Sequence, residues 1–266
     1  MKEPHVESLV YRAESAKDIT YDDPPPVEID KDKWEGCLEN GILTCRMKIH
    51  YASVSDARKE IESYLRAWEV NANLKQGKGS IKFVYQNANV VDLAPQETGR
   101  GVVVCGKAAV MGVGTMIASA QISRKNYPPP PKNFIVSPDV ETLLGRYEGY
   151  LDGKEPLQSM AYFCLTMVER IYGGQQKKGE NIRKAAARTM KVDFEVLDTL
   201  GKLTSERGDE TTARKFSRQP SPLTGTECAW IASVVKELIY RVGEYSGCRD
   251  NSTLTQITMA DFPSLK

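Results

Sequence analysis

The sequence predicts an α+β fold: a small antiparallel sheet with one covering helix, followed by an all-helical domain of about five helices. Residues 42–51 alternate apolar and polar side chains, which is typical of a strand buried on one face. Residues 54–72 place apolar side chains at helical spacing, and after the proline run at 128–131 every strongly periodic segment has that spacing. Strands in one part of the chain and helices in the other are typical of this fold class.

The first 33 residues are predicted to form an acidic N-terminal arm. They show no sustained periodicity, and the run of three prolines at 24–26 disfavours regular structure. Residues 1–39 carry eleven acids and five bases, a net charge of −6. We therefore expect the folded sheet domain to begin at Trp34 and to extend to residue 127.

The sheet domain is predicted from local signals in chain order. The Asn40-Gly41 pair is a turn signal before the strand at 42–51, and Ser53 is a suitable N-cap for the helix at 54–72. A second alternating segment predicts a strand at 79–86. Further extended segments are predicted at 102–105 and 109–124.

A stiff polyproline linker at 128–132 is the predicted boundary before a helical domain at 133–266. The helix at 156–172 is apolar on most faces, so we expect the other helices to enclose it, with the ring of Phe163 in the core. The C-terminal residues are apolar enough that we expect this tail to be docked. The remaining helices are predicted at 137–151, 181–191, 193–203 and 224–247.

Composition places the chain among ordinary soluble globular proteins. Of its 266 residues, 41% are hydrophobic and 27% are charged, and the net charge is +1, which indicates neither nucleic acid nor membrane as a partner. No apolar run reaches the ~18 residues that a membrane span needs. The six cysteines are scattered and form no CxxC pair, so we expect free thiols and a cytoplasmic protein.

The sequence lacks the residue patterns of most known catalytic sites. The only two histidines are His5, in the predicted arm, and His50, at the end of a strand, so no histidine pair is expected to bind zinc. The chain contains no nucleophile elbow, no phosphate-binding loop and no dinucleotide fingerprint. We therefore predict no metal and no cofactor, and whether the chain is an enzyme stays open.

An acidic cluster is the one candidate for a catalytic site. Glu148, Asp152 and Glu155 lie at the junction of two predicted helices, beside Tyr147 and Tyr150. Such a group can hold a metal or act as an acid and base. Helix ends also collect acidic residues for capping and solubility, so both interpretations stay open.

Basic residues give a candidate surface for a polyanion. The segment 177–218 lies in a basic region, since residues 170–218 carry twelve bases against seven acids. Its residues 183–203 fit the apolar spacing of a helix-turn-helix, although Lys191 replaces the usual turn glycine and acids on the second helix oppose phosphate binding. The candidate residues are Arg46, Lys48 and Lys82 on the sheet, and Lys177, Lys178, Arg183, Lys184 and Arg188 in the basic segment.

The leading interpretation is a cytoplasmic binding or scaffold protein without a catalytic site, which acts with a protein partner or as a homo-oligomer. One alternative is a nucleic-acid-associated protein that uses the basic segment, and another is an enzyme at the acidic cluster. We further expect the strands at 42–51 and 79–86 to be neighbours, with their lysines and arginine on one face. The acidic arm would then cover that basic face, and deleting residues 1–30 would leave the fold intact.

Overall fold

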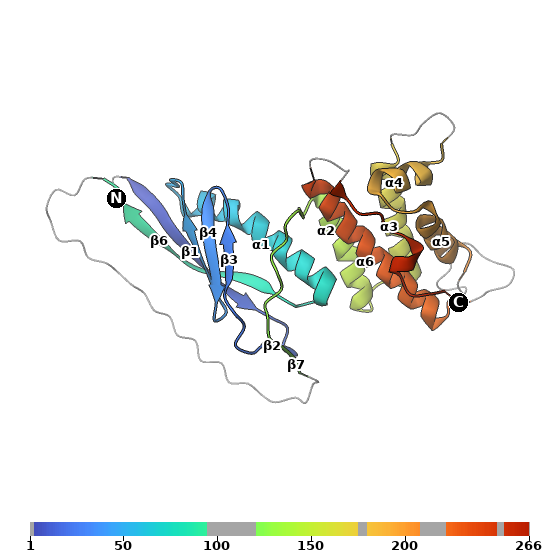
Figure 1. Ribbon diagram of the computed structural model, residues 1–266, viewed down its shortest axis with the longest axis horizontal. Helices are drawn as coiled ribbons and strands as arrows, with labels where there is room; N and C mark the ends of the chain where they lie inside the picture. Colours follow the sequence, from blue (N-terminus) through green and yellow to red (C-terminus); the bar gives the residue numbers. More distant parts are fainter. Residues whose placement is uncertain (1–2, 95–120, 175–179, 208–221, 249–252, 266) are drawn as a thin grey trace. The chain divides into compact units, whose positions relative to one another are not determined.

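The computed structural model describes residues 3–94, 121–174, 180–207, 222–248 and 253–265 (Figure 1). Strands occupy the first part of the chain and helices the second, so the predicted α+β fold class is confirmed. The chain divides into two compact units, Met1–Pro130 and Pro131–Lys266. Their boundary lies inside the predicted 128–132 linker, and each unit is described by itself.

The N-terminal unit contains a five-stranded antiparallel sheet with the strand order β3-β4-β5-β1-β6 (Figure 1). Two short strands outside this sheet, β2 (Ile19–Tyr21) and β7 (Ile122–Arg124), pair in parallel. The predicted segment at 102–105, most of that at 109–124, and Cys105 lie outside the described residues. The strands of the large sheet are β1 (Pro4–Glu14), β3 (Val27–Asp30), β4 (Trp34–Glu39), β5 (Ile42–Met47) and β6 (Lys82–Asp92).

The predicted N-terminal arm is wrong, because residues 4–14 form an inner strand of this sheet. Leu9 of β1 lies opposite Cys45 of β5 on one side and opposite Ala88 of β6 on the other. The register shifts at Glu7, between Val6 and Ser8, as it does at a β-bulge. A bulge reverses the alternation of side chains, so Val6 and Leu9 both face the core although they are three residues apart.

Because residues 4–14 form a strand, two further expectations are also wrong. The strands predicted at 42–51 and 79–86 are not neighbours, since β1 lies between β5 and β6. The N-terminal segment therefore does not cover a basic face as an accessory. It supplies the strand that joins the two halves of the sheet.

Helix α1 (Val54–Gln76) covers one face of the sheet, as predicted. Its N-cap is the expected Ser53, whose side chain accepts a hydrogen bond from the Asp56 amide at 3.2 Å. The indole of Trp68 donates to the Pro128 carbonyl at 2.9 Å, which fixes the start of the proline run on this unit. The core between helix and sheet includes Val6, Leu9, Leu38, Leu43, Cys45, Ala57, Ile61, Leu65, Trp68 and Ile81.

The turn before β5 also has its predicted form. Asn40 and Gly41 connect β4 to β5 as a two-residue loop, and their φ angles are 50° and 76°. Two positive φ values characterise the hairpin turn that follows the twist of paired strands. Because this turn sets the register, Leu43, Cys45 and Met47 face the core while Arg46 is exposed.

The C-terminal unit consists of helices packed around α3, which contacts α2, α4, α5 and α6. The predicted enclosure of this segment is therefore correct on four sides. The capping box at Thr224 and Glu227 and the buried stripe from Trp230 to Val242 are also as expected. The helices are α2 (Pro138–Leu151), α3 (Leu157–Tyr172), α4 (Ile182–Met190), α5 (Phe194–Ser205) and α6 (Gly225–Gly247).

The described part of the C-terminal tail docks on the connection between α4 and α5. Ile257 is buried, donates from its amide to the Lys191 carbonyl at 2.9 Å, and accepts from the Asp193 amide at 2.8 Å. The ring of Phe262 meets that of Trp230 edge to face, with ring centres 5.9 Å apart. Hydrogen bonds and an aromatic contact thus hold the tail against the helices.

Two further observations concern the whole described chain. Among its described residues no helix is both long and apolar enough to cross a membrane. The five cysteines within the described ranges, Cys37, Cys45, Cys164, Cys228 and Cys248, are free.

Substitutions on the buried face of α3 should lower the free energy of unfolding more than substitutions at its partly exposed positions. Leu165 is 1% exposed, so Leu165→Ala should lower the free energy of unfolding by ~2–5 kcal/mol. Phe163 is only partly buried, and the Arg146 guanidinium lies 4.2 Å from its ring centre, so the expected full enclosure of this ring is wrong. Phe163→Ala should therefore cost less than the ~3–5 kcal/mol of an enclosed ring. Urea unfolding of both variants measures the difference, and a larger loss for Phe163→Ala would contradict this packing.

Candidate functional site

The face of the large sheet opposite α1 carries a hollow of about 440 Å³. It lies over three neighbouring strands, β3, β4 and β5. The residues that face it alternate with the core residues of the same strands, as the pleat of a strand requires. The outward side chains of its lining are Glu28, Asp30, Glu35, Cys37, Thr44 and Arg46.

Carboxylates outnumber cations in this hollow. Glu28, Asp30 and Glu35 line it together with one cation, Arg46, and strand pairing places Glu35 opposite Arg46. The ammonium of Lys48 forms an ion pair with Asp30, and this hydrogen bond lowers the pKa of the Asp30 carboxyl below its usual value. The lining therefore suits a positively charged group better than an anion.

The thiol in the hollow is not prepared for nucleophilic chemistry. Burial, and after it a hydrogen bond to Glu28 and the negative charge of that residue, together raise the pKa of Cys37 to about 11. A thiol with this pKa stays protonated near neutral pH, whereas the thiolate is the reactive form. The lining contains no histidine that could act as its base.

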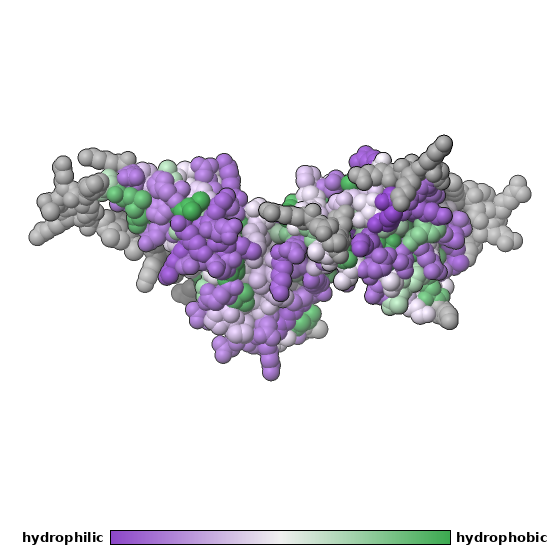
Figure 2. Space-filling model, turned by 45° about the horizontal axis from the view of Figure 1, so that its top comes forward, coloured by the Kyte–Doolittle hydropathy of each residue, from purple (hydrophilic) through white to green (hydrophobic). Residues whose placement is uncertain are grey.

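The surface of the molecule in the view of Figure 2 is mostly hydrophilic, with small hydrophobic patches.

The three cations predicted on the sheet are not brought together as one basic patch. Arg46 lines the acidic hollow, and Lys48 is paired with Asp30 and donates to the Lys31 carbonyl at 3.0 Å. Lys82 is exposed at the start of β6, opposite Glu14 of β1. The intervening strand β1 separates Lys82 from the other two.

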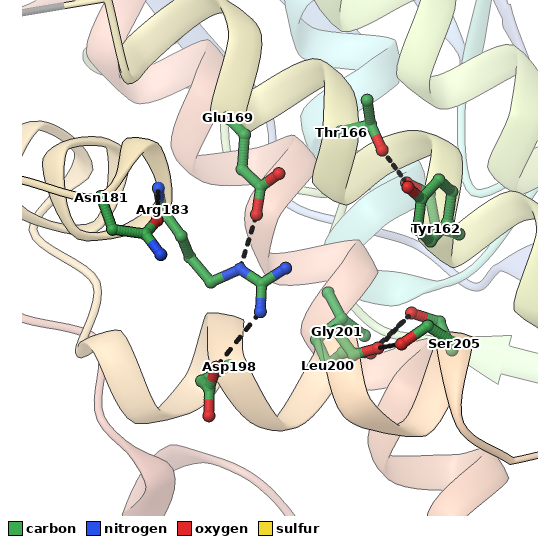
Figure 3. Close-up of polar contacts among 10 residues, drawn as sticks. Tyr162, Thr166, Glu169, Asn181, Arg183, Asp198, Leu200, Gly201 and Ser205 are labelled. Atoms are coloured by element: carbon green, nitrogen blue, oxygen red, sulfur yellow. Dashed lines mark hydrogen bonds and ion pairs between the residues drawn. The ribbon is translucent and has the colours of Figure 1, made fainter.

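Arg183, predicted to contact a polyanion, instead ties three helices together (Figure 3). Its Nε donates to Glu169 of α3 at 2.6 Å, and its Nη1 donates to Asp198 of α5 at 3.2 Å. Lys202 also pairs with Asp198 at 2.8 Å, and these cations lower the pKa of the Asp198 carboxyl, Lys202 most strongly. A Cβ added at Gly201 would lie 2.5 Å from the Arg183 guanidinium, so the glycine makes room for this contact.

Other cations of the basic segment are also engaged. Arg188 pairs with Glu180 at 3.2 Å. The Lys184 ammonium lies 5.3 Å from the ring centre of Phe194, within the range of a cation–π contact. Lys177 and Lys178 lie outside the described residues.

The α4–α5 hairpin has the turn of a helix-turn-helix but an unsuitable surface for DNA. Lys191 adopts the left-handed conformation, with φ 53°, at the position where that motif usually has glycine. The start of α5 is occupied by the tail, because Gln256 donates to the Asp193 carboxylate at 2.7 Å. Glu195 is exposed on the same helix, and its charge repels phosphate.

The acidic cluster is divided among separate contacts. Glu155 pairs with Arg146 at 2.8 Å, and Asp152 pairs with Lys154 at 3.1 Å. The amide of Asp152 donates to the Glu148 carbonyl at 2.9 Å, as at the end of a helix. Throughout the ranges that the structure covers, no three His, Cys, Asp or Glu side chains are grouped so that they could hold a metal ion.

Sequence reasoning missed a buried arginine. Arg241 is 1% exposed and donates to the carbonyls of Met190 at 2.7 Å and Thr255 at 2.7 Å, as well as to Glu244 at 3.2 Å. It therefore joins α6, the end of α4 and the tail. Its partners are main-chain oxygens far along the chain, and these leave no pattern in the sequence.

The two histidines, which the sequence analysis placed in separate parts of the chain, lie in contact. His5 and His50 stack, with ring centres 5.3 Å apart and an angle of 21° between the ring planes. They meet because β1 lies beside β5 and the residues that follow it. Recognition of β1 as a strand would have brought the two histidines together.

Comparison with known proteins adds no relative, since no protein-family model, curated protein or solved structure matches this chain.

Proposed function

We propose that this chain is a non-catalytic binding protein, and that the face of its N-terminal sheet opposite α1 receives a positively charged segment of a protein partner. The observation that carries the proposal is the hollow lined by Glu28, Asp30 and Glu35. Its volume of about 440 Å³ is within the ~300–1,000 Å³ of ordinary binding sites, and it accommodates a lysine or arginine side chain.

The backbone around the hollow supports recognition of a partner without rearrangement. The hollow lies on three strands held by two antiparallel ladders, β3 with β4 and β4 with β5. The covered face of the same strands is anchored by core residues such as Leu38 and Leu43. Preformed backbone reduces the entropy that is lost on binding.

The charges in the hollow determine how tightly a basic peptide is expected to bind. The outward side chains of the lining include three carboxylates and one guanidinium, and Lys48 pairs with one of these carboxylates, so the net charge of the group with Lys48 is −1. Ion pairs at an exposed surface contribute only about 0.2–1 kcal/mol each, and salt screens them. We therefore expect weak binding that depends strongly on ionic strength and on the positive charge of the ligand.

The free cysteines Cys37, Cys45, Cys164, Cys228 and Cys248 suit a reducing compartment, and we place the protein in the cytoplasm on that ground. Nucleic acid is not proposed as the partner. Arg183 and Arg188 are engaged with carboxylates, and the exposed Glu195 opposes phosphate.

The proposal is tested by titrating the isotope-labelled protein with a short lysine- and arginine-rich peptide and following the backbone amide signals. The largest shifts are expected at Glu28, Glu35 and Thr44. The double variant Glu28→Gln/Glu35→Gln should weaken binding about two- to thirtyfold, the range expected from losing two exposed ion pairs. An acidic peptide of equal length should not bind.

A matched control makes the same change in net charge elsewhere. Glu195 and Glu206 are both exposed on the C-terminal unit, so Glu195→Gln/Glu206→Gln removes two carboxylates outside the hollow. Its affinity for the peptide should equal that of the wild-type protein. Equal weakening in both double variants, or shifts spread over the whole surface, would show non-specific attraction and contradict the site.

A further inference from the structure

We infer that His5 and His50 form a binding site for a divalent transition-metal ion such as Ni²⁺, Cu²⁺ or Zn²⁺, with water in the remaining positions of its coordination shell. This site is independent of the proposed peptide-binding hollow, whose lining contains neither residue. These are the only histidines in the chain, and they are in contact. Imidazole is a preferred ligand of these ions, while magnesium and calcium prefer oxygen.

The separation of the two rings fits a shared ion. A metal–nitrogen bond of about 2.0–2.1 Å places the centres of two imidazoles on one tetrahedral ion roughly 5 Å apart. The observed ring centres are 5.3 Å apart, but the rings are stacked with 21° between their planes, so one ring must turn before both can coordinate the same ion. Because His50 is exposed, rotation of its side chain can aim a nitrogen at the ion without moving the backbone.

The backbone holds both residues in place. His5 belongs to β1 and lies opposite Val91 of β6. The segment with His50 continues beside β1, where the Val6 amide donates to the Tyr51 carbonyl at 2.9 Å. The two imidazoles therefore project from adjacent, hydrogen-bonded segments, and little conformational freedom is lost when they bind one ion.

The surroundings favour a cation. The Nδ1 atom of His5 is buried and has no hydrogen-bond partner, so coordination through this atom would give it one. Acidic residues flank His5 along the chain at Glu3 and Glu7, and Asp92 lies opposite the adjacent Pro4. Their negative charges raise the local concentration of cations.

The site has an open coordination shell. In the described ranges no third His, Cys, Asp or Glu side chain completes a metal-binding group. Two protein ligands hold an ion less tightly than the four of a structural zinc site, so we expect an exchangeable ion. Removing the metal should leave the fold intact.

The test is titration of the untagged, metal-free protein with Ni²⁺ alone at pH 7.5, followed through the imidazole signals in NMR. Both histidine signals should broaden first and together. His50→Gln should weaken Ni²⁺ binding at least tenfold, because one of the two imidazole ligands is lost. The exposed position of His50 makes this variant suitable, and its circular dichroism checks that it is folded.

A second variant tests whether the thiol of Cys248 binds the ion instead. Cys248→Ser removes a free, partly exposed cysteine and should leave the affinity for Ni²⁺ unchanged. Wild-type affinity in His50→Gln, or a loss in Cys248→Ser as large as in His50→Gln, would overturn the inference. Failure of the wild-type protein to bind Ni²⁺ at millimolar concentration would overturn it as well, and none of these results bears on the peptide site.

Discussion

Deletion of residues 1–30 should abolish the cooperative unfolding of the N-terminal unit. The deletion removes β1, which pairs with β5 on one side and β6 on the other, and the edge strand β3. It also removes Val6, Leu9 and Tyr11 from the core, each at most 1% exposed. Each buried side chain of this size contributes roughly 1.5–3 kcal/mol, and the loss of two backbone ladders adds to that deficit, so the total is comparable to the ~5–15 kcal/mol stability of a typical domain.

Point substitutions on the same strand provide graded controls. Leu9→Ala should lower the free energy of unfolding by ~2–5 kcal/mol, because Leu9 is fully buried. Arg12 faces solvent, so Arg12→Ala should change it by no more than about 0.5–1 kcal/mol. Denaturant unfolding followed by circular dichroism measures all three proteins. A deletion variant that keeps the wild-type transition would contradict the inner position of β1.

Arg241→Ala should cause the largest loss of any single charged residue in the C-terminal unit. Its guanidinium is 1% exposed and bonds to Glu244 and to carbonyls of the α4 end and the tail. Removing it takes a donor away from the carbonyl oxygens of Met190 and Thr255, and breaking a buried charged contact of this kind costs about 3–5 kcal/mol. The tail should also undock, because Thr255 loses its link to α6.

Arg188→Ala is the matched control, since Arg188 pairs with Glu180 but is exposed. Its loss should cost only about 0.2–1 kcal/mol. Urea unfolding gives the two free energies, and hydrogen exchange at Ile257 reports whether the tail has undocked. Equal losses for the two variants would show that Arg241 does not join the tail to the helices.

Long helices were predictable because their signals are local. α1, α3 and α6 each combine a capping or stop residue with apolar spacing over several turns, and their bounds agree with the sequence prediction within a few residues. The phase of β5 was predictable for the same reason, since the Asn40-Gly41 turn fixes it. Phe163 shows the limit of this approach, because the arrangement of neighbouring helices decides which apolar residue is enclosed.

β1 could not be found by strict alternation. The bulge at Glu7 changes the side on which residues lie, so Val6 and Leu9 obey no single period of two. The prolines and acids that follow β1 also resemble a solvated arm. Because the sequence analysis did not predict this strand, it made β5 and β6 neighbours and placed His5 far from His50.

The candidate sites depend on contacts between distant residues. The hollow forms only because β3 pairs with β4. Arg183 is paired with the carboxylates of Glu169 and Asp198, which are 14 and 15 residues away in the chain. A count of charges along the chain shows basic residues but not the carboxylates that engage them. The sequence therefore predicted that the surface is polar. The candidate sites could be located only in the folded structure, because they are formed by residues that are distant in the chain.

Hydrogen exchange of the β1 amides measures most directly whether residues 4–14 form an inner strand, on which the histidine pair and the integrity of the sheet depend. The amides of Leu9 and Tyr11 should exchange as slowly as that of Cys45 in β5, because inner-strand amides exchange only when the whole sheet opens. Rapid exchange at Leu9 and Tyr11 while Cys45 stays protected would contradict this arrangement.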